Sequence, residues 1–131
     1  MDMFDVDWTD ELLSDAREVV LEILAEDATG DEPDLDALAH SVRAHRERVH
    51  RNARPMTDLD LADTLCEATL GLLHRAADWS PDQRRLASVA ARYYVSPRQD
   101  DDLGSPFGFD DDVEVFNAIA ARIAPELVLA G

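Results

Sequence analysis

Arginine is concentrated in one short segment of this sequence. Residues 40–54 contain five arginines and a single acid, Glu47. Guanidinium groups bind phosphates and carboxylates through paired hydrogen bonds, so the segment predicts a surface for a phosphate, an RNA or an acidic protein. Arg43, Arg46 and Arg51 are the candidate partner-binding residues. The alternative is a solvated helix face paired with the chain's own carboxylates, which the sequence favours because 29 acids compete for these arginines.

Three histidines in the same segment do not have the spacing of a metal site. His40, His45 and His50 are five residues apart. Each step of five residues turns a helical side chain by about 140°. Side chains spread in this way do not converge on one ion, so we predict no metal ligation by these histidines.

A polar face is expected on the helix that follows. Asp60, Asp63, Glu67 and His74 recur there at helical spacing. Carboxylates and an imidazole can bind a metal or exchange protons when a second helix supplies partners. The spacing is also that of any amphipathic helix, so we interpret this face as the solvated side.

Two aspartate triplets flank a segment with an apolar tip. Residues 100–102 and 110–112 are all aspartate, and Phe107 and Phe109 between them are candidate partner contacts. Clustered carboxylates suit a hard cation such as Ca²⁺, although the spacing does not match an EF-hand loop. The alternative is that one triplet caps a helix and the other is a solvated turn. The candidate metal ligands are Asp100, Asp102, Asp110 and Asp111.

Between 86 and 117, a helix with a terminal tyrosine is followed by a proline, an aspartate-rich turn, a glycine and paired aspartates. The residues in this order are Ala90, Ala91, Tyr94, Pro97, Asp100 or Asp101, Gly108, Asp111 and Asp112. The arrangement resembles the YkvA-like family of small helical bacterial proteins. That family usually has a second Pro-Asp in its turn, where this chain has 102–106. The resemblance implies a helical fold and brings no established activity with it.

Composition restricts the classes of partner. The chain has 131 residues, 29 acids and 12 bases, all arginine, and a net charge of −17. Such a surface repels nucleic acids and anionic membranes, so we expect neither as a partner, whereas a basic protein would suit it. Cys66 is the only cysteine and is interpreted as a small buried hydrophobe. Without a signal peptide or a membrane-spanning run, the sequence predicts a cytoplasmic protein, and we predict no cofactor.

Apolar side chains return about once per helical turn in five segments. The pattern predicts an all-α, single-domain bundle of about five amphipathic helices over 1–131, with 1–7 and 125–131 as the segments free to fray. The predicted helices are 8–26, 34–52, 57–77, 80–95 and 110–124.

Local residue types predict where several helices begin. Thr9 or Asp10 can cap the first helix, and Thr57 has the position of a capping box for the third. Ser80 has the clearest capping box, with proline following it and glutamine three residues on. In the fourth helix the residues expected to face inward are Leu86, Ala90 and Tyr93.

No set of catalytic residues with a known spacing occurs in the sequence. The leading hypothesis is therefore a non-enzymatic protein–protein interaction module, which would be an adaptor, a regulator or an inhibitor with a strongly acidic surface. One alternative is an immunity protein, an antitoxin or a nucleic-acid mimic that covers a basic partner. Another is a metal-dependent enzyme or sensor that uses the aspartate-rich segment. The acidity would also fit adaptation to a salty cytoplasm. The partner's identity and the oligomeric state do not follow from the sequence.

Overall fold

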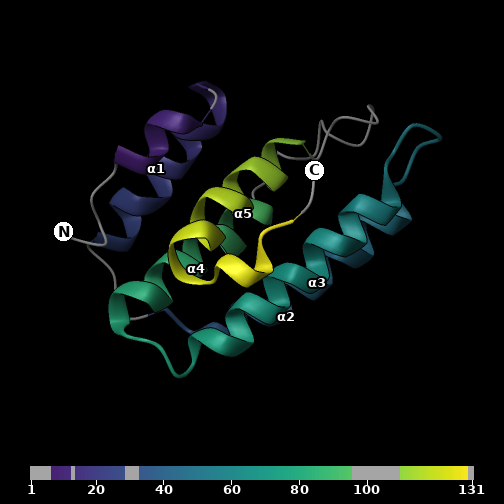
Figure 1. Cartoon of the computed structure of the whole chain (residues 1–131). Coiled ribbons are helices and arrows are strands. Elements are labelled where there is room, and N and C mark those ends of the chain that lie inside the picture. The colour runs from purple at the N-terminus through teal and green to yellow at the C-terminus, as the bar shows by residue number, and fades with distance from the viewer. Residues whose placement is uncertain (1–6, 13, 29–32, 96–109, 130–131) are drawn as a thin grey trace.

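The chain folds as an all-α bundle (Figure 1). The computed structural model describes residues 7–12, 14–28, 33–95 and 110–129. Within these ranges the α-helices are α1 (Ser14–Ala28), α2 (Leu35–Arg51), α3 (Leu59–Ala76), α4 (Pro81–Tyr94) and α5 (Asp110–Ile123), and the 3₁₀-helices are η1 (Asp7–Glu11) and η3 (Pro125–Leu127). The predicted fold class is confirmed. In the described part of the chain, no helix is long and apolar enough to cross a bilayer.

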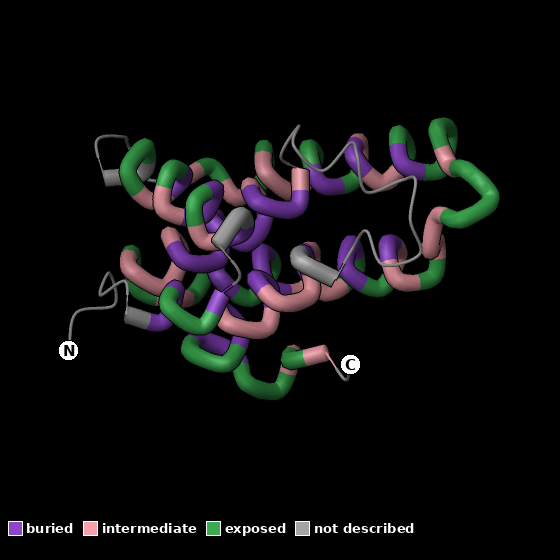
Figure 2. The backbone as a smooth tube through the Cα atoms, turned by 90° about the horizontal axis from the view of Figure 1, so that it is seen from above, coloured by how far each residue is buried: buried purple, intermediate pink, exposed green. Residues whose placement is uncertain are grey.

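Helix α4 is the central element of the bundle, with contacts to α1, α2, α3 and α5. Leu86, Ala90 and Tyr93 are buried, as the sequence predicts. The whole run 86–91 is also buried, so α4 is enclosed on more sides than an amphipathic pattern implies (Figure 2). Small side chains make this possible, because alanine and serine fill much of the run and allow neighbouring helices to approach closely.

Helices α2 and α3 pack side by side, and the turn that joins them extends beyond the other described helices (Figures 1 and 2). Helix α3 is capped by Asp58, whose Oδ1 accepts a hydrogen bond from the backbone N–H of Leu61 at 3.0 Å. The capping box predicted at Thr57 is therefore wrong by one residue. Thr57 Oγ1 accepts a hydrogen bond from the backbone N–H of Arg54 at 2.9 Å instead, and this bond closes the turn.

Two other helices begin close to their predicted positions, and each has a side-chain cap. Asp34 caps α2 by accepting a hydrogen bond from the backbone N–H of Ala37 at 3.1 Å. The capping box at Ser80 is confirmed, because Ser80 Oγ accepts from the N–H of Gln83 at 3.4 Å and the Gln83 side chain accepts from the N–H of Ser80 at 3.2 Å. These contacts satisfy backbone donors that have no partner inside the helix.

The single helix predicted over 8–26 is divided into η1 and α1. The backbone N–H of Leu12 donates to the carbonyl of Thr9 at 3.0 Å, which is the bonding pattern of a 3₁₀ turn rather than an α-helix. Neither Thr9 nor Asp10 therefore caps α1. Contacts with α5 hold η1 in place, and an ion pair of 3.2 Å joins Arg17 of α1 to Asp10.

The C-terminal residues up to Leu129 dock against the bundle. Asn117 on α5 accepts a hydrogen bond from the backbone N–H of Leu129 at 2.7 Å and donates one to its carbonyl at 3.1 Å. Arg75 of α3 forms an ion pair with Glu126 in η3. These contacts attach the segment after α5 to two helices.

The bundle is stabilised by one apolar core. Its largest fully buried side chains include Leu65, Leu72, Leu86, Val20 and Ile119, which come from α1, α3, α4 and α5. Burial of this apolar surface is the main favourable contribution to folding.

Truncating a core leucine should destabilise the bundle strongly. Leu65 is 1% exposed, so Leu65→Ala leaves a cavity and should lower the free energy of unfolding by about 2–5 kcal/mol. Urea unfolding followed by circular dichroism measures the change. The control is Met56→Ala, since Met56 is 55% exposed and its truncation should cost less than about 0.5 kcal/mol. Equal losses in the two variants would contradict the core described above.

Candidate functional site

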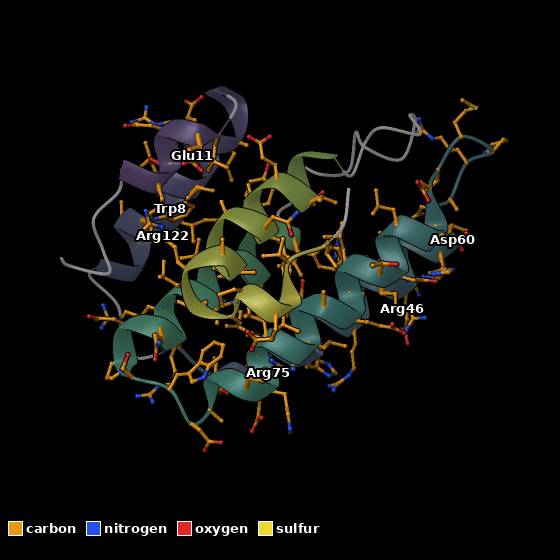
Figure 3. The ribbon with its side chains drawn as sticks, in the orientation of Figure 1. Trp8, Glu11, Arg46, Asp60, Arg75 and Arg122 are labelled. Carbon is orange, nitrogen blue, oxygen red and sulfur yellow. The ribbon has the colours of Figure 1, made fainter. Side chains whose placement is uncertain are left out.

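The candidate site is an open pocket of about 630 Å³ on the surface of α2. Among the described residues it is lined by Arg43, Arg46, Glu47, His50 and Arg51, and we call it the arginine groove. All three arginines that the sequence predicts as partner contacts lie in it. Figure 3 shows Arg46 on the α2–α3 side of the molecule, far from Arg122 on α5.

The buried side of α2 determines which residues face outward. Val42, His45 and Val49 follow the spacing of one helical face, and all three are buried. The His45 ring packs edge-on against Tyr94 of α4, with ring centroids 4.9 Å apart and an interplanar angle of 75°. With this face turned inward, the arginine groove lies on the solvent side and along the border with α3.

Hydrogen bonds hold the His45–Tyr94 pair. The Tyr94 hydroxyl donates to the carbonyl of Ala62 on α3 at 3.2 Å, and burial raises the pKa of Tyr94. Arg48 Nη2 lies 3.4 Å from His45 Nδ1. Because a guanidinium only donates, Nδ1 is the acceptor in this contact.

The sequence could have indicated the burial of His45, which lies three residues after Val42 and four before Val49. The contact of the His45 ring with Tyr94, however, depends on the packing of α2 on α4, which the sequence pattern does not show. The three histidines of the segment face different surroundings, since His40 and His50 are exposed while His45 is buried.

Asp63 of α3 contacts two of the residues that line the groove. Its Oδ1 accepts hydrogen bonds from Arg46 Nε at 3.0 Å and from His50 Nε2 at 2.6 Å. The hydrogen bond from His50 lowers the pKa of Asp63, and the bond from Arg46 lowers it further, against an opposing effect of burial. On the polar face predicted for α3, Asp60, Glu67 and His74 are exposed, while Asp63 is half-buried and reaches α2.

Arg43 and Arg51 have no ion-pair or hydrogen-bond partner among the described residues, and both are exposed. Other arginines form ion pairs between elements of the bundle. These pairs are Arg17–Asp10, Arg46–Asp63, Arg75–Glu126 and Arg92–Glu26. The interpretation that the chain's own carboxylates cover the arginine-rich segment therefore holds, within the described residues, for Arg46 but not for Arg43 or Arg51.

Other candidates from the sequence lie outside the described residues. These are Phe107, Phe109, Asp100 and Asp102. Asp110 and Asp111 are the first two residues of α5, and their side chains are not described. Among the described residues, no three histidine, cysteine or acidic side chains are placed to hold a metal ion. Cys66 is fully buried, as the sequence predicts, and burial raises the pKa of its thiol.

A second open pocket, of about 610 Å³, lies between η1 and α5. Its lining includes Trp8, Glu11 and Arg122 (Figure 3). Trp8 is only 3% exposed, because most of its ring packs into the core. This pocket combines two acids, one base and apolar side chains, whereas three arginines line the arginine groove.

Comparison with protein-family models, with curated proteins and with solved structures gives no match. The resemblance to the YkvA-like family therefore stays a prediction. Of the residues that support it, Ala90, Ala91, Tyr94 and Asp112 are buried in the bundle.

Replacing Asp63 should lower stability in a pH-dependent way. Since the pKa of Asp63 is lowered in the folded chain, its carboxylate stabilises the fold above the ordinary aspartate pKa of about 3.9. That contribution is lost as the pH falls through the lowered value. Asp63→Asn should therefore reduce the free energy of unfolding at neutral pH by about 0.2–1 kcal/mol, the range for partly exposed pairs.

Urea unfolding of both proteins across a pH series measures this difference. The two proteins should converge in stability as the pH falls below about 4. Asp78→Asn is the control, because Asp78 is exposed and makes no ion pair among the described residues. A stability difference between wild type and Asp63→Asn that stays constant with pH would show that the carboxylate charge is not responsible.

Proposed function

We propose that this chain is a non-enzymatic protein–protein interaction module, an adaptor, regulator or inhibitor that contacts its partner through the arginine groove. The observation that carries the proposal is that Arg43 and Arg51 are exposed and unpaired, among the described residues, in a chain of net charge −17. With 29 acids in the sequence, pairing within the chain would be the expected state of these arginines.

The groove has properties of a contact surface. Arginine is enriched at protein–protein interfaces, where its planar guanidinium forms several directed hydrogen bonds. Arg43, Arg46 and Arg51 are placed on one helix whose opposite face is locked into the core. A rigid support of this kind limits the conformational entropy that is lost on binding.

A cytoplasmic location fits this proposal. Cys66 is the only cysteine, and it is a buried free thiol that takes no part in a disulfide. Intracellular proteins commonly keep their thiols reduced.

A second candidate function is supported by an acidic ridge on α1. Glu18, Glu22 and Glu26 are exposed and four residues apart, so they lie along one side of the helix. Such a ridge would suit an immunity protein, an antitoxin or a nucleic-acid mimic that covers a basic partner. This function requires the partner to depend on Glu18 and Glu22 rather than on the arginine groove.

Capture of partners from an extract of the native cell tests the proposed function. The bait proteins are the wild type, Arg43→Glu/Arg51→Glu, Glu18→Gln/Glu22→Gln and the control Arg122→Glu. We expect a protein that the wild type and Arg122→Glu retain, and whose recovery falls about tenfold or more with Arg43→Glu/Arg51→Glu. Raising the salt concentration should release it, because salt screens exposed charges.

Quantitative mass spectrometry measures the recovery of each captured protein. Loss only with Glu18→Gln/Glu22→Gln would assign the contact to the acidic ridge and support the second function. Failure to enrich any protein, even at low salt, would contradict both functions.

A further inference from the structure

Two residues that line the groove already bind a carboxylate of the chain itself. Arg46 and His50 both donate to the same oxygen of Asp63, at 3.0 and 2.6 Å. The contact shows that two lining side chains can converge on one carboxylate oxygen. Among its described contacts, Arg46 uses only its Nε–H for this bond, so its terminal N–H groups are available to a second acceptor.

The length of the groove suits a short extended peptide. Arg43 and Arg51 are eight residues apart on α2, which corresponds to about 12 Å along the helix axis. In an extended chain, side chains on one face recur every two residues, so three of them span about 14 Å. Three carboxylates at alternate positions therefore match the distance covered by Arg43, Arg46 and Arg51.

Carboxylates limit the basic surface on two sides. Asp36 lies in the first turn of α2, about two turns before Arg43. Asp60 and Glu67 are exposed on α3, before and after Asp63. A long polyanion such as a nucleic acid would extend beyond the groove and meet these acids, whereas a segment of a few residues would not.

We infer that the arginine groove binds a short, extended acidic segment of a partner protein, with carboxylates at alternate positions. The inference rests on the proposed function, for which it specifies the chemistry of the partner. Glu47 lies four residues from both Arg43 and Arg51 within the groove and repels such a segment. Glu47 therefore weakens binding and makes it selective for a ligand that carries enough charge to overcome the repulsion.

Fluorescence anisotropy with a defined probe tests the inference. The probe is a short fluorescein-labelled peptide with three glutamates at alternate positions, and its counterpart has glutamines there. We expect Arg43→Glu and Arg51→Glu each to weaken binding of the glutamate peptide by about tenfold, and Glu47→Gln to strengthen it about threefold. Arg122→Glu carries the same charge change as either single variant, lies on α5, and should have little effect.

Several outcomes would overturn the inference. Equal binding of the glutamine peptide would show that carboxylates are not recognised. An equal loss with Arg122→Glu would show that overall charge, rather than the groove, determines binding. A single-stranded oligonucleotide of matched charge that binds more tightly than the peptide would assign the groove to nucleic acid instead.

Competition separates this inference from the proposed function. If a captured cellular protein depends on Arg43 and Arg51 but the glutamate peptide does not displace it, the proposed function stands and the acidic segment is wrong. If the glutamate peptide binds in the groove but no protein is captured, the inferred chemistry stands and the proposed function is wrong. Displacement of the captured protein by the glutamate peptide, and not by the glutamine peptide, supports both.

Discussion

Burial of α4 is the constraint on which the rest of this structure depends. The run 86–91 is enclosed, and α1, α2, α3 and α5 all contact this helix. Because the run is rich in small side chains, several helices can approach it closely, and each neighbour must then turn an apolar side inward. This packing therefore determines which residues of each neighbouring helix face solvent.

The consequence is clearest for α2. Its His45 ring packs on Tyr94 at the C-terminal end of α4, and the Tyr94 hydroxyl is bonded in turn to Ala62 of α3. The cost of burying these two polar rings is lowered because the Tyr94 hydroxyl and His45 Nδ1 each have a hydrogen-bond partner. This contact joins three helices and fixes the rotation of α2 about its axis, which places the arginine groove on the surface.

Charge in this chain is distributed unevenly. Several arginines join separate elements through ion pairs, and Asp63 of α3 is paired with Arg46 and His50, which line the groove. Arg43 and Arg51 line the same groove but form no ion pair with any described residue. The field of the chain as a whole is negative, so attraction of an acidic ligand would act at short range, over about one Debye length.

The sequence by itself determines the local features: the amphipathic helices, the capping box at Ser80, and the concentration of arginine in 40–54. These depend on residues within one or two helical turns of each other. The 3₁₀ start at η1, the cap at Asp58 in place of Thr57, and the pairing of Asp63 with α2 follow from the tertiary structure. The tertiary structure also determines which arginines form ion pairs, because a carboxylate on another helix comes within reach only where the two helices pack together.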